Sequence, residues 1–393
     1  MIDIWAIVAL LLSLALGWIL GRGMAKPKRH MYSQQSLSRD YFVGLDHLLN
    51  ENTDEAIESF IRALEVNSET IPAHLALAKL FRRKGDVQRA INIHQTLLAR
   101  PDLSRPDSLR IQMALAIDYD ALGLLDRAEN LLIDIIKQNP PRSIRKKTLT
   151  LLTRLYEKEG EWQQALDTAA KLGSDHSDEL WHDLAHYCCE LAEKSLLKQD
   201  YKSATTFLKQ SLGFDAKCVR SSFLQAKMAM QQQQWKSAVK ALRQVEEQDP
   251  LFISETIEDL RQCYMALHTP QEYEHYLRQC LAKAPSATVI LALADAVMEN
   301  RGVYAAGAFI TDELKYRPSI KGFNRLIDLH IEHGSESAVD SLKVLRSLTG
   351  TLEMSKPRYL CGHCGFSAKS LVWQCPSCKK WGSSRPIQGL EGE

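Results

Sequence analysis

The stretch FRRKGDVQRAINIHQTLL, residues 81–98, contains the unit from which most of the chain is built. It begins at the end of one helical pattern and turns at Gly85. It then continues as a second helical pattern, in which Ala90, His94 and Leu97 recur at intervals of four and three positions. Residues at that spacing lie on one face of a helix. A glycine turn between two such patterns predicts a pair of antiparallel helices joined by a short loop.

The same pattern returns along the middle of the chain at nearly constant intervals, the sign of an internal repeat. Its key alanine recurs every 34 to 39 residues, at Ala56, Ala90, Ala128, Ala165, Ala204 and Ala238. Weaker copies follow at Ala306 and Ala338, and a degenerate copy lies near Glu272 and Tyr276. Twelve positions before the six key alanines are small or hydroxyl-bearing residues, at Gly44, Ala78, Ala116, Thr153, Ala192 and Ala226. Small residues at both places predict closely packed helix pairs.

This arrangement resembles the tetratricopeptide repeat, with about nine units over residues 38–349. The predicted fold class is therefore all-α, a superhelical solenoid of stacked helix pairs. An irregular helical bundle is the alternative, but bundles do not return the same residue types at a near-constant period. A solenoid offers a concave surface that favours the binding of another protein over catalysis.

Four cysteines near the end of the chain predict a metal site within residues 350–393. Cys361 and Cys364 form one close pair, and Cys375 and Cys378 form another after ten residues. Two residues between cysteines allow both thiolates of a pair to reach one ion, and a second pair completes a tetrahedron. The spacing is typical of a rubredoxin-type or zinc-ribbon module that holds one tetrahedral thiolate-bound ion, zinc or iron. Disulfides are the alternative, and a cytoplasmic location disfavours them.

The N-terminal region predicts a membrane anchor within residues 1–21. Ile4 to Leu20 is a run of 17 residues without a charge, at the short end of what crosses a bilayer. A cleaved signal peptide would need positive charge before the run, whereas Asp3 precedes it and basic residues follow it in the linker at 22–37. By the positive-inside rule, the N-terminus lies outside and the body in the cytoplasm. A buried soluble helix is the competing interpretation.

Charge is unevenly distributed along the chain. Residues 356–385 carry six basic side chains and no acidic one, whereas residues 30–353 have a formal charge of −6. The basic ribbon could therefore dock on the acidic repeats or on anionic lipid headgroups. Nucleic acid is not expected as a partner, because the module lacks a long basic stripe and an array of stacking aromatic residues.

Other candidate sites are weak, and no catalytic residue is predicted. His182 and His186 stand one helical turn apart, as in H-E-x-x-H metalloproteases, but Asp183 replaces the glutamate and no third ligand is evident. These histidines are interpreted as packing residues. Cysteines elsewhere in the repeats are interpreted as small buried residues, at Cys188, Cys189, Cys218, Cys263 and Cys280. The chain has no phosphate-binding glycine loop and no nucleophile elbow, which favours a non-enzymatic protein.

Three sequence segments together carry a resemblance to a known family. They are LSRDYFVGLDHLLNE at 37–51, the helix pair at 81–98, and SKPRYLCGHCGF with WQCPSCKKW at 355–381. With the N-terminal anchor, they resemble the lipopolysaccharide assembly protein B family over essentially the whole chain. The resemblance implies metal ligation at Cys361, Cys364, Cys375 and Cys378.

The resemblance also implies a function at the Gram-negative inner membrane. Members of the family are adaptors that promote degradation of the deacetylase LpxC by the protease FtsH, and thereby limit lipopolysaccharide synthesis. A membrane regulator related to PbgA, also called YejM, restrains them. The residues that bind these partners are not marked by any short motif, and the sequence leaves homodimer formation open. Two alternatives are a scaffold for lipopolysaccharide assembly enzymes and an iron-containing redox or electron-transfer protein.

Overall fold

The computed structural model describes residues 39–66, 71–173, 178–333 and 336–393. It divides into two compact units, residues 1–155 and 156–393, which are treated separately below. The anchor and linker expected at 1–37 lie outside the described residues. Within the described parts of the chain, no helix has the length and apolar character needed to span a bilayer.

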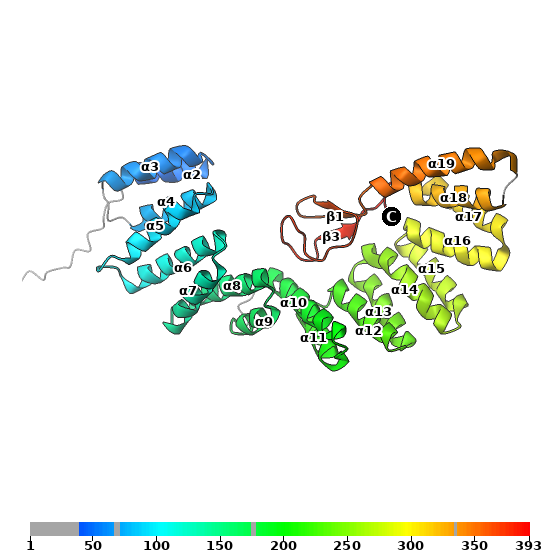
Figure 1. The fold of residues 1–393 in the computed structure, drawn as a ribbon, viewed down its shortest axis with the longest axis horizontal. Coiled ribbons are helices and arrows are strands. Elements are labelled where there is room, and N and C mark those ends of the chain that lie inside the picture. The colour runs from blue at the N-terminus through cyan, green and yellow to red at the C-terminus, as the bar shows by residue number, and fades with distance from the viewer. Residues whose placement is uncertain (1–38, 67–70, 174–177, 334–335) are drawn as a thin grey trace, which may run out of the picture. The chain divides into compact units, whose positions relative to one another are not determined.

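The regular secondary structure in the described residues of the first unit is all helical (Figure 1). Its helices are α2 (Arg39–Leu49), α3 (Thr53–Val66), α4 (Ile71–Arg83), α5 (Val87–Leu98), α6 (Arg105–Ala121) and α7 (Leu125–Lys137), followed by α8 (Arg142–Glu159), which crosses the boundary between the units. Helices α2 and α3, α4 and α5, and α6 and α7 pack as successive pairs. Within this unit, each pair also contacts the next one along the chain.

The second unit contains the remaining helix pairs and a small sheet. Its helices are α9 (Trp162–Ala170), α10 (Asp178–Leu197), α11 (Tyr201–Phe214), α12 (Val219–Gln231), α13 (Trp235–Gln248), the 3-10 helix η1 (Pro250–Phe252), α14 (Ile253–Ala266), α15 (Pro270–Lys283), α16 (Ala287–Arg301), α17 (Val303–Tyr316), α18 (Ile320–His333) and α19 (Glu336–Ser355). The closest pairings are again between consecutive helices, such as α10 with α11 and α12 with α13. The all-α repeat fold expected from the sequence is therefore confirmed for the helical part of the chain.

The residues that defined the repeat in the sequence pack at the helix contacts. All six key alanines, from Ala56 to Ala238, are completely buried. The small residues of the preceding helices are buried as well, and a Cβ placed on Gly44 would lie 3.1 Å from the ring of Phe60. Since a larger side chain would separate the paired helices, these positions explain why small residues recur at the observed period.

The turn inside a helix pair has its own regular feature. In the described chain, a residue with positive φ lies in this turn in eight consecutive pairs, at Glu51, Gly85, Gly123, Gly160, Gln199, Gln233, His268 and Gly302. This left-handed conformation ends the first helix of the pair and redirects the chain into the second. Glycine occupies only half of these turns, so glycine spacing alone underestimates the number of repeats.

A buried ionic cluster joins three helices of the first unit. Asp118 of α6 is completely buried and accepts hydrogen bonds from Arg82 of α4, at 2.5 Å, and from the ring of His94 of α5. We expect Asp118→Ala to destabilise this unit by about 3–5 kcal/mol, because it leaves a partly buried guanidinium and a buried imidazole without their acceptor. Urea unfolding followed by circular dichroism measures the loss.

Asp134→Ala is the matched control for the Asp118 substitution. Asp134 pairs with Lys137 at 3.1 Å, but its side chain is 60% exposed, so we expect a loss below about 1 kcal/mol. Equal losses from the two substitutions would contradict the structural role of the buried cluster.

The sheet follows α19 and consists of three short strands. The strands are β1 (Tyr359–Cys361), β2 (Ser367–Ala368) and β3 (Ser384–Pro386), in the order β2-β1-β3 with antiparallel pairing throughout. The residues after β3 pack back on the helices. Ile320 at the start of α18 donates its amide hydrogen to the carbonyl of Leu390, and the Glu393 carboxylate accepts from the amide of Thr288 in α16. We refer to residues 359–386 as the ribbon.

Candidate metal centre

Each close pair of cysteines in the ribbon forms the same kind of turn. The amide of Gly365 donates to the carbonyl of Cys361 at 3.0 Å, and the amide of Lys379 donates to the carbonyl of Cys375 at 2.9 Å. Gly365 and Lys379 both have positive φ, at 76° and 61°. Glycine adopts this conformation without steric cost at position 365, whereas Lys379 adopts it at the cost of a side chain in the left-handed region.

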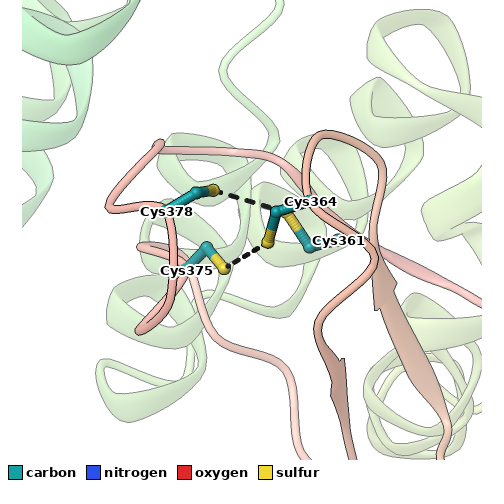
Figure 2. A group of neighbouring side chains, drawn as sticks. All are labelled: Cys361, Cys364, Cys375 and Cys378. Atoms are coloured by element: carbon teal, nitrogen blue, oxygen red, sulfur yellow. Dashed lines mark hydrogen bonds between the residues drawn. The ribbon is translucent and has the colours of Figure 1, made fainter. Parts of the chain in front are cut away.

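The two turns bring four sulfur atoms together, as Figure 2 shows. The sulfur of Cys361 lies 3.7 Å from that of Cys378, and the sulfur of Cys364 lies 3.6 Å from that of Cys375. All four lie within 4.8 Å of one another. Four thiolates arranged tetrahedrally at about 2.3 Å from a zinc ion would be about 3.8 Å apart, so the cluster fits one such ion. The metal-binding module expected from the sequence is confirmed.

The surroundings favour the thiolate at two of the four sulfurs, those of Cys361 and Cys364. Desolvation raises the pKa of Cys361, but the hydrogen bond between Cys361 and Ser383 and those from the amides of His363 and Cys364 outweigh it and lower the pKa to about 6. A hydrogen bond from the amide of Phe366 lowers the pKa of Cys364. At Cys378 a hydrogen bond from the amide of Lys380 lowers the pKa, but desolvation and the neighbouring cysteines outweigh it and raise the pKa to about 11. Deprotonated sulfur is the form that binds a metal ion. With four protein ligands the coordination is closed, which suits a structural ion or a one-electron centre rather than Lewis-acid catalysis.

Trp381 anchors the ribbon to the repeats. Its indole N–H donates to Oε1 of Glu157 in α8 at 2.7 Å. The same carboxylate oxygen accepts from Gln374 of the ribbon at 3.0 Å, and Oε2 accepts from the hydroxyl of Tyr187 in α10 at 2.7 Å. One carboxylate therefore joins the ribbon to two helices. Trp381 also meets the ring of Trp162 edge-on, with 5.8 Å between centroids.

Two histidines of α10 lie directly under Trp381. The ring of His186 stacks on the indole at 5.1 Å with an interplanar angle of 20°. Burial holds the pKa of His186 well below its usual range, so the stacked ring is neutral near pH 7. His182 makes a hydrogen bond of 2.8 Å to Asp215, and this bond raises the pKa of His182 and lowers that of Asp215. The packing role expected for both histidines is confirmed, although the surface on which they pack was not foreseen.

Arg220 of α12 also contacts the indole of Trp381. Its guanidinium lies 5.9 Å from the centre of a Trp381 ring and donates to Glu190 at 2.8 Å and to Glu193 at 2.7 Å. The arginine side chain is only 5% exposed, so both carboxylates are needed to balance a charge held away from water. This pair of ionic bonds fixes the cation beneath the indole.

Trp373 makes a second apolar contact between the ribbon and the repeats. Trp373 stacks on Phe252 of η1 at 5.9 Å and packs with Leu371 against Val219 at the start of α12. Two of the ribbon's four cations also pair with acids of the repeats, Lys380 with Glu179 at 3.3 Å and Arg385 with Asp249 at 3.4 Å. The structure thus supports docking of the basic ribbon on the acidic repeats.

Gly382 marks the closest approach of the ribbon to α10. A Cβ at this position would lie 2.6 Å from Nε2 of His182, and the residue has a φ of +56°. We expect Gly382→Ala to loosen the docked ribbon, because it adds a clash to a backbone cost of about 1–2 kcal/mol. Hydrogen exchange of the metal-loaded protein should become faster in the ribbon and around His182.

Gly389→Ala is the control for this substitution. Gly389 also has a positive φ, at +101°, but a Cβ there would meet no atom within 4 Å. We expect it to leave exchange around His182 unchanged. If the two alanine variants exchanged alike, close packing at Gly382 would not hold the ribbon.

Sequence reasoning identified the four cysteines that the fold brings together, but it missed the surface on which the ribbon docks. Glu157, Arg220 and Trp373 carry no motif that marks this contact. Their partners are distant in the sequence, as for Glu157 and Trp381, which are 224 positions apart. One feature of the sequence could have indicated this surface. The segment WHDLAHY places His182 and His186 one helical turn apart, beside further aromatic residues, which is unusual for a helix face that only packs in a repeat.

Comparison with known proteins yields matches for both parts of the chain. Residues 359–386 match the family model described as a rubredoxin metal binding domain, and residues 73–106 and 148–173 match a tetratricopeptide repeat model. Lipopolysaccharide assembly protein B of Escherichia coli strain K12 is 36% identical over 379 residues, which cover 96% of each chain. The protein of the same name from Haemophilus influenzae is 33% identical over 386 residues, again 96% of each chain.

Solved structures that resemble the chain include the C-terminal part of a repeat protein from Cytophaga hutchinsonii. It has a TM-score of 0.41 and 12% identity, and the match covers 70% of this chain and 94% of that one.

Proposed function

Because the chain belongs to the lipopolysaccharide assembly protein B family, we propose that it acts in lipopolysaccharide assembly as a protein-binding adaptor. The identity extends over both the repeats and the ribbon, so the proposal concerns the whole chain. Repeated helix pairs provide an extended surface for another polypeptide, and the closed thiolate site holds a structural ion. Both features suit a binding protein rather than an enzyme.

The specific adaptor role that we propose is control of lipid A synthesis. The protein would bring the deacetylase LpxC to the membrane protease FtsH and so promote LpxC degradation. A membrane regulator related to PbgA, also called YejM, would restrain it. The observation that supports this proposal is the docking of the ribbon, because Trp381 and its partners fix the metal module on α8, α10 and α12. We propose that the ribbon and these helices together bind the partner.

The proposed location is the inner membrane, with a single anchor at residues 4–20, the N-terminus in the periplasm and the body in the cytoplasm. The apolar run and the basic residues after it support this topology. A membrane tether would raise the local concentration of the repeats near a membrane protease. Removal of residues 1–21 should therefore weaken function without unfolding the repeats.

Affinity capture from detergent-solubilised membranes tests the adaptor role. The full chain with a C-terminal tag should retain both FtsH and LpxC, and Trp381→Ala should retain less of at least one of them. Phe366→Ala is a suitable control, because this ribbon aromatic is partly exposed and lies outside the docking contacts described above. Capture of other assembly enzymes without FtsH or LpxC would instead favour a general scaffold.

An iron-containing electron-transfer protein is the second candidate. The exposed Cys364 favours it, because a thiolate at the surface would give an electron a short path to the ion. Metal analysis and a visible spectrum of protein purified without added metal distinguish the candidates. Zinc without absorption bands between 350 and 600 nm, roughly the range of ferric thiolate, supports the adaptor. A reversibly reducible iron centre that is required in cells supports electron transfer.

A further inference from the structure

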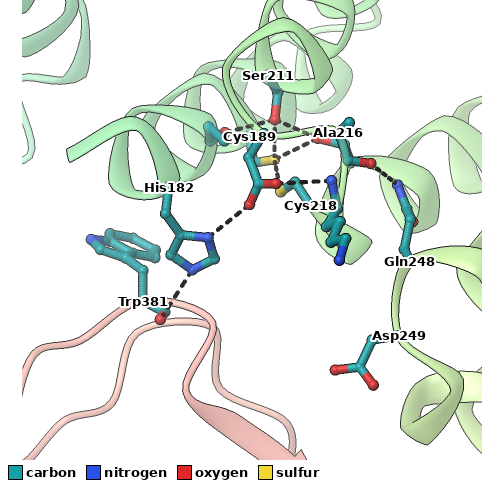
Figure 3. A network of polar contacts seen from close by, with 12 residues as sticks. His182, Cys189, Ser211, Ala216, Cys218, Gln248, Asp249 and Trp381 are labelled. Carbon is teal, nitrogen blue, oxygen red and sulfur yellow. Dashed lines mark hydrogen bonds and ion pairs between the residues drawn. The ribbon is translucent and has the colours of Figure 1, made fainter. Parts of the chain in front are cut away.

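Two buried thiols face each other behind the docking surface of the ribbon. Cys189 lies in the middle of α10, and Cys218 is the residue immediately before α12. Their sulfur atoms are 3.9 Å apart, and both are free thiols. Figure 3 shows the two residues in their polar surroundings. A disulfide has a sulfur separation of about 2.05 Å, so the two atoms need to approach by less than 2 Å to bond.

The two thiols differ in reactivity because their environments differ. Burial raises the pKa of Cys189 well above its usual range. The hydrogen bond from Cys189 lowers the pKa of Cys218, with a further contribution from the hydroxyl of Ser221. Cys218 also stands at the N-terminus of a helix of 13 residues, where the helix dipole stabilises negative charge. Cys218 is therefore the thiolate of the pair, and Cys189 is the thiol that resolves it.

Hydroxyl groups hold the pair in place. The sulfur of Cys189 lies 3.2 Å from the hydroxyl of Ser221 and 3.4 Å from that of Ser211. Ser211 donates in turn to the carbonyl of Ala185 at 2.8 Å. A network of this kind fixes the direction of both sulfurs and differs from the apolar surroundings of a cysteine that only fills space.

A small cavity gives access to Cys218. It has a volume of about 260 Å³, lies between the ribbon and the repeats, and is lined by Cys218 together with His182, Asp215, Lys217, Gln248 and Arg385. Apolar side chains of Val219, Phe252 and Trp373 complete the lining, and the cavity is large enough for a molecule of the size of hydrogen peroxide. Cys189 has no exposed surface, so an oxidant that enters this cavity reaches Cys218 first.

We propose that Cys218 is a peroxide-reactive site that forms a reversible disulfide with Cys189. The Cys218 thiolate attacks one oxygen of hydrogen peroxide, the O–O bond breaks, and the released hydroxide takes up a proton to leave as water. Cys189 then loses its proton and attacks the sulfenic acid sulfur, the S–O bond breaks, and the leaving hydroxide takes that proton to form a second water. Two thiols and one peroxide give one disulfide and two waters.

The cross-link would join the two helices that carry the ribbon. Helix α10 supplies His182 and His186 beneath Trp381, and Val219, which follows Cys218, packs against Trp373. A disulfide between α10 and the start of α12 therefore connects both sides of the docking surface.

Peptide mapping of the zinc-loaded full chain tests the proposal. Peroxide is added in steps, at doses below those that release zinc to a chromogenic chelator, and free thiols are then alkylated. Trypsin should give one cross-linked product between residues 172–194 and 218–220, which dithiothreitol separates. Because residues 172–194 contain both Cys188 and Cys189, single alanine variants identify the partner.

Cys188→Ala is the matched control, because its thiol is equally buried but desolvation raises its pKa to about 12. This variant should cross-link as the unchanged protein does. Cys189→Ala and Cys218→Ala should each lower the product at least tenfold, and in Cys189→Ala a dimedone adduct should accumulate on Cys218. Circular dichroism confirms that each variant is folded. Absence of the product before zinc release, or its retention in folded Cys189→Ala, would overturn the proposal.

Discussion

Cys375→Ser is expected to abolish metal binding and unfold the ribbon while the helices remain folded. Cys375 is completely buried, and its sulfur completes the tetrahedron beside Cys364. A module of this size has too little core to fold without its ion, and structural zinc contributes about 10–16 kcal/mol to such folds. Hydrogen exchange should become fast throughout residues 359–386, and metal analysis should show less than about a tenth of an ion per chain.

Cys263→Ser is the control for the ligand substitution. Cys263 is equally buried but lies in α14, where desolvation raises the pKa of its thiol to about 11. It should cost some stability and leave one ion per chain. A ribbon that stayed protected and metal-loaded in Cys375→Ser would contradict a four-thiolate centre.

Trp381→Ala is expected to release a ribbon that still holds its ion. The substitution removes the hydrogen bond to Glu157, the stack on His186 and the contact with Arg220. Loss of a buried tryptophan costs about 3–5 kcal/mol, more than the exposed ion pairs of Lys380 and Arg385 supply, so the contacts of Trp373 and Gln374 are left to hold the ribbon by themselves. Metal content should stay at one per chain, while exchange increases on the face of α10 that contains His182 and His186.

Phe366→Ala separates loss of docking from general damage to the ribbon. Phe366 is an aromatic residue of the same module, and its side chain is 37% exposed. This variant should keep both the ion and the protection of α10. Protection of α10 that survived in Trp381→Ala would show that the indole does not hold the ribbon on the repeats.

The parts of the fold that follow from local sequence were predictable. Ala90 and Ala128 recur because each fills a helix contact with no room for a larger side chain. The spacing of the alanines in the sequence therefore predicts where the helices pack closely. The metal ligands were equally predictable, since two residues between cysteines fix the turn that Gly365 completes. In both cases, neighbours in the sequence are neighbours in space.

The docking surface was not predictable, because it joins residues far apart in the chain. Glu157 resembles any polar residue near the end of a helix until the fold brings Trp381 to it. Cys189 and Cys218 likewise appear as separate small buried residues, and their 3.9 Å separation depends on how α10 and α12 pack. The apolar pattern of one helix predicts which of its faces is buried. It does not identify the residue of another element that covers this face.

The half-life of LpxC in cells tests the central claim most directly. Cells whose own copy is replaced by the unchanged chain, Trp381→Ala or Phe366→Ala would be treated to stop protein synthesis, and LpxC would be followed by immunoblot at matched adaptor levels. We expect LpxC to be degraded at the normal rate with the unchanged chain and Phe366→Ala, and several-fold more slowly with Trp381→Ala. The same LpxC half-life in all three strains would contradict an adaptor that depends on the docked ribbon.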